Sequence, residues 1–386
     1  MIDEEFLPFA LPDIGEQEID AVIDTLRNGW LTTGPRTAAF EHEFASALGG
    51  GVHAVAVNSA TAGLHLALEA LGIGPGDEVL VPTWTFTATA EVVRYVGAEP
   101  VLVDVEPETL NIDLAAAKAG ISDRTKAVIP VHFAGLPVPR AQLEDFAAAH
   151  GLRVIEDAAH AFPAMSSGAV VGTGSSEAVV FSFYATKTMT TGEGGMLVTA
   201  DDMLAARART MRLHGISRDV FNRYRGGATS PWHYDVVAPG FKYNMTDIAA
   251  ALGQVQLRRS EQMRDRRASI AMRYQAAFAD LPVQLPVDVS AGDIPTWHLY
   301  VLRLAADAPL TRGDFIDEMA RLGVACSVHF IPLHRQPYWR QRYDLTDEQF
   351  PIATAEFERV VSLPIFSAMT DNQVQRVITA VRALLA

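Results

Sequence analysis

One lysine follows an apolar run that has the pattern of a buried strand. Lys187 comes shortly after residues 179–183 and stands in a turn of small and hydroxyl-bearing residues. Partial burial disfavours the charged ammonium, so it lowers the pKa of a lysine and favours the nucleophilic neutral amine. A lysine on a surface loop is the commoner case. Other residues that could lie near Lys187 are therefore needed to distinguish a reactive amine from an ordinary surface lysine.

A carboxylate and a helix start can meet this lysine. Asp157 ends a second apolar run, residues 152–157, and ligands gather beyond the carboxyl ends of strands in an open α/β sheet. Residues 58–61 (Asn-Ser-Ala-Thr) precede a strongly helical run, where free backbone N–H groups and two hydroxyls suit a phosphate. Each feature has a simpler interpretation, because Asp, Ser and Thr are also the commonest helix caps.

The three groups together match the needs of one cofactor. Pyridoxal 5'-phosphate (PLP) takes a lysine for its Schiff base, a carboxylate that keeps its pyridine nitrogen protonated, and an anchor for its phosphate. The sequence therefore predicts a PLP site. Phe86 is a candidate to stack on the pyridine ring and His160 to lie beside it, although an aromatic ring or a lone histidine is otherwise a core residue.

The elements that must hold these residues alternate in type. From about residue 12 to 260, helical periodicity alternates with short apolar runs, which predicts a layered α/β domain. The runs are continuously apolar, so we expect strands covered on both faces in a mostly parallel sheet. The predicted strands are residues 78–82, 100–104, 127–131, 153–156, 179–183 and 195–199.

A second pattern follows in the C-terminal part of the chain. A long helix over residues 246–278 bridges into it, and residues 297–302, 311–322 and 324–329 have the pattern of strand, helix and strand. A last helix is predicted over residues 371–385. We expect a large cofactor-binding domain over residues 1–260 and a smaller α+β domain over residues 261–386. The glycine-rich residues 225–230 predict a mobile loop.

Composition and charge argue against several classes of function. With 31 Lys and Arg against 46 Asp and Glu, the chain carries −15 and would repel a nucleic-acid backbone. A hydrophobic fraction of 49% and a charged fraction of 20% are typical of a globular protein without a membrane span. The acidic start and the single Cys326 favour the cytoplasm, since a signal peptide needs positive charge and a lone cysteine allows no internal disulfide. No metal site is predicted.

Taken together, the motifs resemble the DegT/DnrJ/EryC1/StrS family of PLP-dependent sugar aminotransferases, which has the aspartate aminotransferase fold type I. The resemblance covers nearly the whole chain. It is carried by residues 7–9, 29–35, 58–64, 76–79, 154–160, 181–195 and 240–248. It implies PLP fold type I, with a mostly parallel central sheet covered by helices on both faces and a smaller α+β C-terminal domain.

The resemblance also implies roles for single residues. Lys187 would form the Schiff base and Asp157 would pair with the pyridine nitrogen. Phosphate would be held by Ala60, Thr61 and Ser182, with Phe86 stacked on the ring and His160 beside it.

The same resemblance implies a homodimer with shared active sites. In such relatives, residues 240–245 of the partner subunit reach the phosphate. The commoner family pattern has Asn at position 242 and Arg at position 244, where this chain has Lys242 and Asn244. Either residue can therefore make the contact.

A lysine at position 187 implies transamination, because relatives that dehydrate deoxysugars carry histidine there. An amino acid, usually glutamate in this family, would donate the amino group. A nucleotide-linked ketosugar, 4-keto by preference, would accept it. Candidate substrate-binding residues are Trp30, Thr32, His214, Trp232, His329 and His334, of which His329 and His334 can equally stabilise the C-terminal domain. The alternatives are a non-nucleotide acceptor such as a keto-cyclitol, and a non-catalytic PLP-binding regulator.

Overall fold

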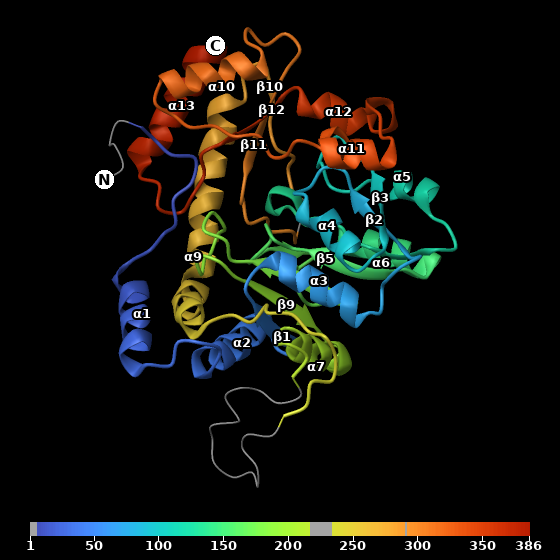
Figure 1. The fold of residues 1–386 in the computed structure, drawn as a ribbon. Coiled ribbons are helices and arrows are strands. Elements are labelled where there is room, and N and C mark those ends of the chain that lie inside the picture. Colours follow the sequence, from blue (N-terminus) through green and yellow to red (C-terminus); the bar gives the residue numbers. More distant parts are fainter. Residues whose placement is uncertain (1–5, 217–233, 290–291) are drawn as a thin grey trace.

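A seven-stranded sheet forms the centre of the larger part of the molecule (Figure 1). The structure is a computed structural model that describes residues 6–216, 234–289 and 292–386. The strand order is β1-β9-β8-β5-β4-β2-β3. These strands are β1 (His53–Val57), β2 (Glu78–Pro82), β3 (Glu99–Val103), β4 (Thr125–Val128), β5 (Arg153–Asp157), β8 (Ala178–Ser182) and β9 (Gly195–Thr199).

Most neighbouring strands of this sheet run parallel. The pairs β3–β2, β2–β4, β4–β5 and β5–β8 are parallel, and β9 is antiparallel to both β8 and β1. The predicted mostly parallel sheet is therefore confirmed. Strand β1 is the one member of this sheet that the sequence analysis did not predict, because its alternating alanines have little β propensity.

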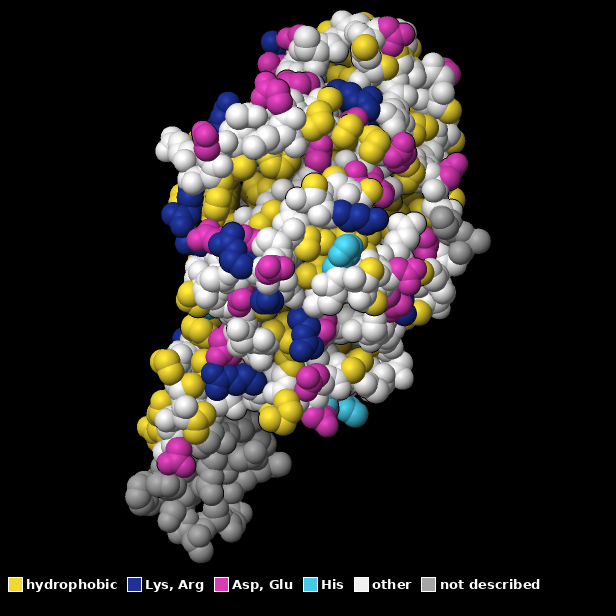
Figure 2. Space-filling view, turned by 90° about the vertical axis from the view of Figure 1, so that its right-hand side faces the viewer, with side chains coloured by type: hydrophobic (Ala, Val, Ile, Leu, Met, Phe, Trp, Pro, Cys, Tyr) yellow, Lys and Arg dark blue, Asp and Glu magenta, His cyan; other side chains and the backbone are white. Residues whose placement is uncertain are grey.

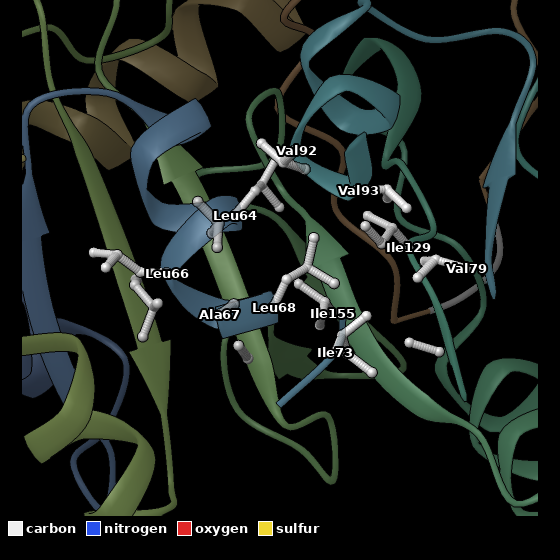
Figure 3. Close-up of a cluster of buried hydrophobic side chains, with 14 of the residues drawn as sticks. Leu64, Leu66, Ala67, Leu68, Ile73, Val79, Val92, Val93, Ile129 and Ile155 are labelled. Carbon is white, nitrogen blue, oxygen red and sulfur yellow. The ribbon is translucent and has the colours of Figure 1, made fainter. Parts of the chain in front are cut away.

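Helices cover both faces of the sheet. Val55 and Val57 of β1 pack on one face with α3 (Ala60–Ala70), α4 (Ala88–Tyr95) and α7 (Asp202–Met211), part of the core drawn in Figure 3. Ala54 and Ala56 point the other way and pack with α2 (Pro35–Ala47) and α9 (Asp247–Phe278). Further along that second face, α5 (Leu114–Ala117) and α6 (Arg140–His150) cover β2, β4 and β5.

A smaller antiparallel sheet, β10-β11-β12, lies in the C-terminal part. Its strands are β10 (Val283–Gln284), β11 (Tyr300–Leu304) and β12 (Val360–Leu363), and they pack with α10 (Arg312–Arg321) and α13 (Asp371–Leu385). The remaining elements are α1 (Glu16–Asn28), the hairpin β6 (Met165–Ser166) and β7 (Ala169–Val170), α11 (Pro337–Tyr343), α12 (Pro351–Phe357) and single-turn helices at Lys118–Gly120, Phe133–Gly135, Leu333–Arg335 and Asp347–Gln349.

The predicted strand over residues 324–329 is wrong. Val324 and Ser327 form only isolated bridges, with Leu7 and Ser362 respectively. The sheet is completed instead by β12, which pairs with β11. Residues 329–330 beyond these bridges line a cavity, so this segment leaves the sheet where the sequence pattern would continue it.

Helix α9 reaches from one hydrophobic core into the other. Ala250 and Leu257 pack beside the seven-stranded sheet, whereas Ile270, Tyr274 and Phe278 pack in the C-terminal core. The helix passes residue 260 without a break, and the division into residues 1–260 and 261–386 stays a prediction. The predicted loop over residues 225–230 and Trp232 lie outside the described residues.

Charges of both signs are mixed on the surface. Figure 2 shows one face on which Lys and Arg side chains are interspersed with Asp and Glu. Within the described ranges, every helix is too short or too polar to span a bilayer. The same residues include no group of three His, Cys, Asp or Glu side chains arranged to hold a metal ion.

Candidate active site

A cavity of about 540 Å³ lies where β5 and β8 end, between the seven-stranded sheet and the C-terminal part. It brings together residues from segments that are far apart in the sequence. The predicted site residues that line it are Ala60, Thr61, Phe86, Asp157, His160, Ser182, Lys187 and His329.

Lys187 stands on the connection between β8 and β9. Its backbone N–H donates to the Tyr184 carbonyl (3.0 Å), and the base of the loop is closed by Phe183 N–H donating to the Gly194 carbonyl (2.9 Å). Burial lowers the pKa of Lys187 to about 8; Asp157 opposes this shift and the Arg267 charge adds to it. The neutral amine is therefore a minor form near neutral pH, but far more abundant than for an ordinary lysine.

Asp157 ends β5 and is buried. Its Oδ2 accepts a hydrogen bond from Thr89 Oγ1 (2.8 Å), and its Oδ1 accepts one from Ala159 N–H (3.1 Å). Burial raises the pKa of this carboxyl, while the two donors and the Lys187 charge oppose the rise. A cation held against Asp157 would favour the ionised form further.

The N-terminus of α3 points to the same cavity. Ser59 caps the helix by accepting from Ala62 N–H (3.1 Å). The N–H groups of Ala60 and Thr61 belong to the first turn, where a helix has no internal acceptors, so they can bind an anion.

A glycine allows the helix start to lie against the sheet. A Cβ on Gly195 would lie 2.7 Å from the Ala60 nitrogen and 2.9 Å from the Phe181 carbonyl oxygen. Because real Cβ atoms do not approach so closely, only glycine fits at the start of β9. This contact keeps the anion-binding helix start next to the loop that carries Lys187.

Aromatic rings and histidines form the rest of the wall. Phe86 is 60% exposed, so its ring is free to meet a ligand. The ring of His160 lies against that of His298 at a tilt of 43°, with ring centroids 4.2 Å apart, and the Nδ1 atoms of both rings have no partner among the described residues. Burial lowers the pKa of both histidines well below the usual value, so both rings are neutral.

His329 is the predicted substrate residue that lines the cavity. Its Nδ1 lies 3.0 Å from Ser362 Oγ and its ring stacks on Phe9. Burial lowers the pKa of His329 to about 4. His334, by contrast, is fully buried away from the cavity, between Thr83 Oγ1 (2.9 Å) and Thr354 Oγ1 (3.0 Å).

Three other predicted residues that the structure describes lie outside the cavity wall. Trp30 and Thr32 belong to the connection between α1 and α2, and the Trp30 indole donates to the Thr33 carbonyl. His214 is an exposed residue that follows α7. Trp232 is outside the described residues.

Lys242 and Asn244 also lie outside the wall and contact each other. The exposed Lys242 donates from Nζ to Asn244 Oδ1 (2.6 Å). Asn244 is buried, and its Nδ2 donates to Thr33 Oγ1 (2.6 Å). Of the two side chains, only that of Lys242 is exposed.

Several residues that line the cavity were not predicted as site residues. They include Phe9, Thr85, Tyr184, His298 and Ile365. His298 and Ile365 come from the C-terminal part, and only packing brings them to the lysine. The sequence around these two residues gave no signal of a site.

The residues of this cavity fit PLP. An amine with a lowered pKa, a buried carboxylate and a free helix N-terminus line one space, and an exposed aromatic ring stands at the same wall. These are the groups that the cofactor's aldehyde, pyridine nitrogen, phosphate and ring face require.

Comparisons with known proteins agree with this geometry. The model of the DegT/DnrJ/EryC1/StrS aminotransferase family matches residues 12–382. The spore coat polysaccharide biosynthesis protein SpsC of Bacillus subtilis is 45% identical over 382 residues, which cover 98% of this chain and 97% of SpsC.

Solved structures give the same result. The PLP-form of Spr1654 from Streptococcus pneumoniae is 33% identical with a TM-score of 0.89, and the match covers 99% of this chain and 100% of that one. Helicobacter pylori PseC, an aminotransferase involved in the biosynthesis of pseudoaminic acid, is 27% identical with a TM-score of 0.89, covering 99% of both chains. The chain therefore belongs to the DegT/DnrJ/EryC1/StrS aminotransferase family and is a PLP-dependent aminotransferase.

Proposed function

We propose that this aminotransferase moves an amino group from an amino acid, glutamate by preference, to a nucleotide-linked ketosugar. The observation that carries the proposal is the meeting of Lys187, Asp157 and the α3 N-terminus at one cavity. When bound, PLP supplies an electron sink for the carbanion that forms at the donor α-carbon. The chain's own residues must then position groups and move protons.

Lys187 is the proposed catalytic base. Its pKa of about 8 lies close to a working pH near neutrality, where a general base is most efficient. Its Nζ would take the proton from the α-carbon of the amino donor and return a proton in the reverse half of the reaction. Asp157, as a carboxylate, would hold a positive charge on the pyridine nitrogen.

The phosphate would be bound by Ala60, Thr61 and Ser182, with Lys242 of a second subunit completing the site. The exposure of Lys242 and the burial of Asn244 support this choice. It requires the homodimer with shared sites that the family resemblance implies. Phe86 would stack on the ring and His160 would lie beside it.

The acceptor is proposed from the relatives and from the cavity. SpsC is named for polysaccharide biosynthesis and PseC for pseudoaminic acid biosynthesis, which supports a sugar acceptor. A 4-keto group on a nucleotide-linked sugar stays our preferred form, and His329 is the cavity residue best placed to meet that substrate. Trp30, Thr32, His214, Trp232 and His334 stay predictions, as does the cytoplasmic location.

A two-stage assay tests the proposal. The PLP-loaded protein is first converted with glutamate, washed, and then offered nucleotide ketosugars and a keto-cyclitol in parallel. Return of the PLP absorbance with a nucleotide 4-ketosugar supports the proposal, whereas return with the cyclitol alone would assign the other acceptor class. A protein that binds PLP but reacts with neither glutamate nor any other amino acid donor would instead be the regulator.

A further inference from the structure

Two threonine hydroxyls form a short hydrogen-bonded chain that ends on Asp157. Thr85 Oγ1 lies 2.7 Å from Thr89 Oγ1, and Thr89 Oγ1 lies 2.8 Å from Asp157 Oδ2. Thr89 is completely buried in α4 and Thr85 is 1% exposed, although Thr85 also lines the cavity. The chain therefore connects the cavity wall to the carboxylate through protein atoms alone.

The chemistry of the groups fixes the direction of these hydrogen bonds. An ionised carboxylate only accepts, and each hydroxyl has one hydrogen to donate. When Asp157 is ionised, Thr89 must therefore donate to Asp157 and Thr85 must donate to Thr89. The Phe86 carbonyl, 3.2 Å from Thr89 Oγ1, is the competing acceptor, but the shorter bond to a charged oxygen is the stronger one.

This direction matters because Asp157 is buried. Burial favours a neutral carboxylic acid, which could not hold a positive charge on a pyridine nitrogen. Thr89 and the Ala159 N–H each supply one donor, to different oxygens, and each donor favours the ionised form. Lys187 and His132 are the titratable groups whose charges act on Asp157 in the same sense.

We propose that Thr89, supported by Thr85, is a positioning residue that holds Asp157 as a correctly oriented carboxylate and so sets the affinity of the site for protonated PLP. The inference rests on the proposed role of Asp157 towards the pyridine nitrogen. A merely structural Thr89 would use its hydroxyl only to satisfy the Phe86 carbonyl within the first turn of α4.

Thr89→Val tests the inference, because valine keeps the shape of threonine and removes the donor. PLP affinity is measured by titrating the apoprotein across the acid pH range. We expect Thr89→Val to bind PLP at least roughly tenfold more weakly than the wild type. On acidification it should lose affinity at a higher pH than the wild type, because a less stabilised carboxylate takes up its proton at a higher pH. Thr89→Ser keeps the hydroxyl and should match the wild type in affinity and in the pH at which affinity is lost. Thr25→Val is the matched control, because it removes a buried hydroxyl that bonds only within α1 and should change neither.

Thr85→Val removes the outer hydroxyl of the hydrogen-bonded series and leaves the bond between Thr89 and Asp157 in place. Alone it should weaken PLP binding a few-fold, and in the Thr89→Val background it should have no further effect, because Thr85 acts only through Thr89. The inference would be overturned if a folded Thr89→Val protein bound PLP as tightly as the wild type and lost that affinity at the same acid pH. If Thr89→Val does not fold, the inference is overturned when Thr85→Val loses PLP affinity at the same acid pH as the wild type.

Asp157→Asn distinguishes this failure from failure of the proposed function. If Asp157→Asn binds PLP and turns over normally, the role of Asp157 is wrong and the inference falls with it. If Asp157→Asn loses affinity and activity while Thr89→Val does not, only the role of the threonines is wrong.

Discussion

At the scale of single residues, the chemistry depends on an amine that is kept from full protonation. Lys187 owes its lowered pKa to burial in a cavity that also holds two neutral histidines. Among the described residues, Asp157 is the carboxylate whose charge opposes the shift. The site therefore places a reactive base and an acid group in one space while leaving the amine partly neutral.

Lys187→Ala should abolish transamination while leaving the fold intact. The variant removes the only proposed base and the attachment point for PLP, so borohydride should no longer fix the cofactor to the protein covalently. An assay of transamination measures the lost activity, mass spectrometry of the reduced protein measures the attachment of PLP, and circular dichroism measures whether the fold is intact. Covalent PLP in the variant would show that another lysine carries the cofactor.

The rate at which the apoprotein captures PLP should rise with pH to a plateau, with the midpoint of the rise near pH 8. Only the neutral amine attacks the aldehyde, and its fraction increases as pH passes through the Lys187 pKa of about 8. An unperturbed lysine would keep gaining reactivity up to about 10.4. Stopped-flow absorbance across this range measures the midpoint, and a midpoint near that of a free lysine would contradict the burial argument.

At the scale of the elements, α2 is capped by a residue from α9. Gly34 at the helix start has no side chain, and the Asp247 carboxylate accepts from the N–H groups of Gly34 (2.8 Å), Arg36 (3.0 Å) and Thr37 (2.9 Å) and from the Thr37 hydroxyl (2.7 Å). Asp247 is almost completely buried. One side chain therefore fixes α2, α9 and the connection at residues 30–34 relative to each other.

Asp247→Ala should lower the free energy of unfolding by about 2–3 kcal/mol, because it leaves several buried donors without an acceptor. Urea unfolding followed by circular dichroism measures the change. Asp280→Ala is the matched control: its ion pair with Arg382 is exposed, and such pairs contribute little. Equal urea midpoints for the two variants would mean that the Asp247 cap stabilises the fold no more than an exposed ion pair does.

Most features that depend on local sequence patterns were predicted correctly from the sequence. Apolar runs identified six strands of the main sheet, and small residues beside Lys187 marked the loop. Long-range contacts were not predictable in this way. Asp247 caps a helix that precedes it by some two hundred residues, and His298 and Ile365 reach the cavity only through packing of the C-terminal part. Residues 324–329 have a strand pattern, but only Ser327 bridges to β12, and the chain then leaves the sheet to line the cavity.

At the scale of the whole molecule, the proposed sharing of sites between subunits can be tested with two inactive variants. Lys187→Ala and Lys242→Ala should each lose most activity as homodimers. Mixed dimers should regain activity, because one of their two sites combines Lys187 of one chain with Lys242 of the other. The readout is turnover after subunit exchange, with each variant incubated alone as the control. If both lysines act within one chain, mixing restores nothing.

The continuity of α9 limits how the molecule can move. The helix has 32 residues, which corresponds to about 48 Å at a rise of about 1.5 Å per residue, and it contributes side chains to both cores. A large swing of the C-terminal part would require this rod to bend. We therefore expect small-angle scattering profiles with and without PLP to superimpose, because the two cores keep their spacing along this helix.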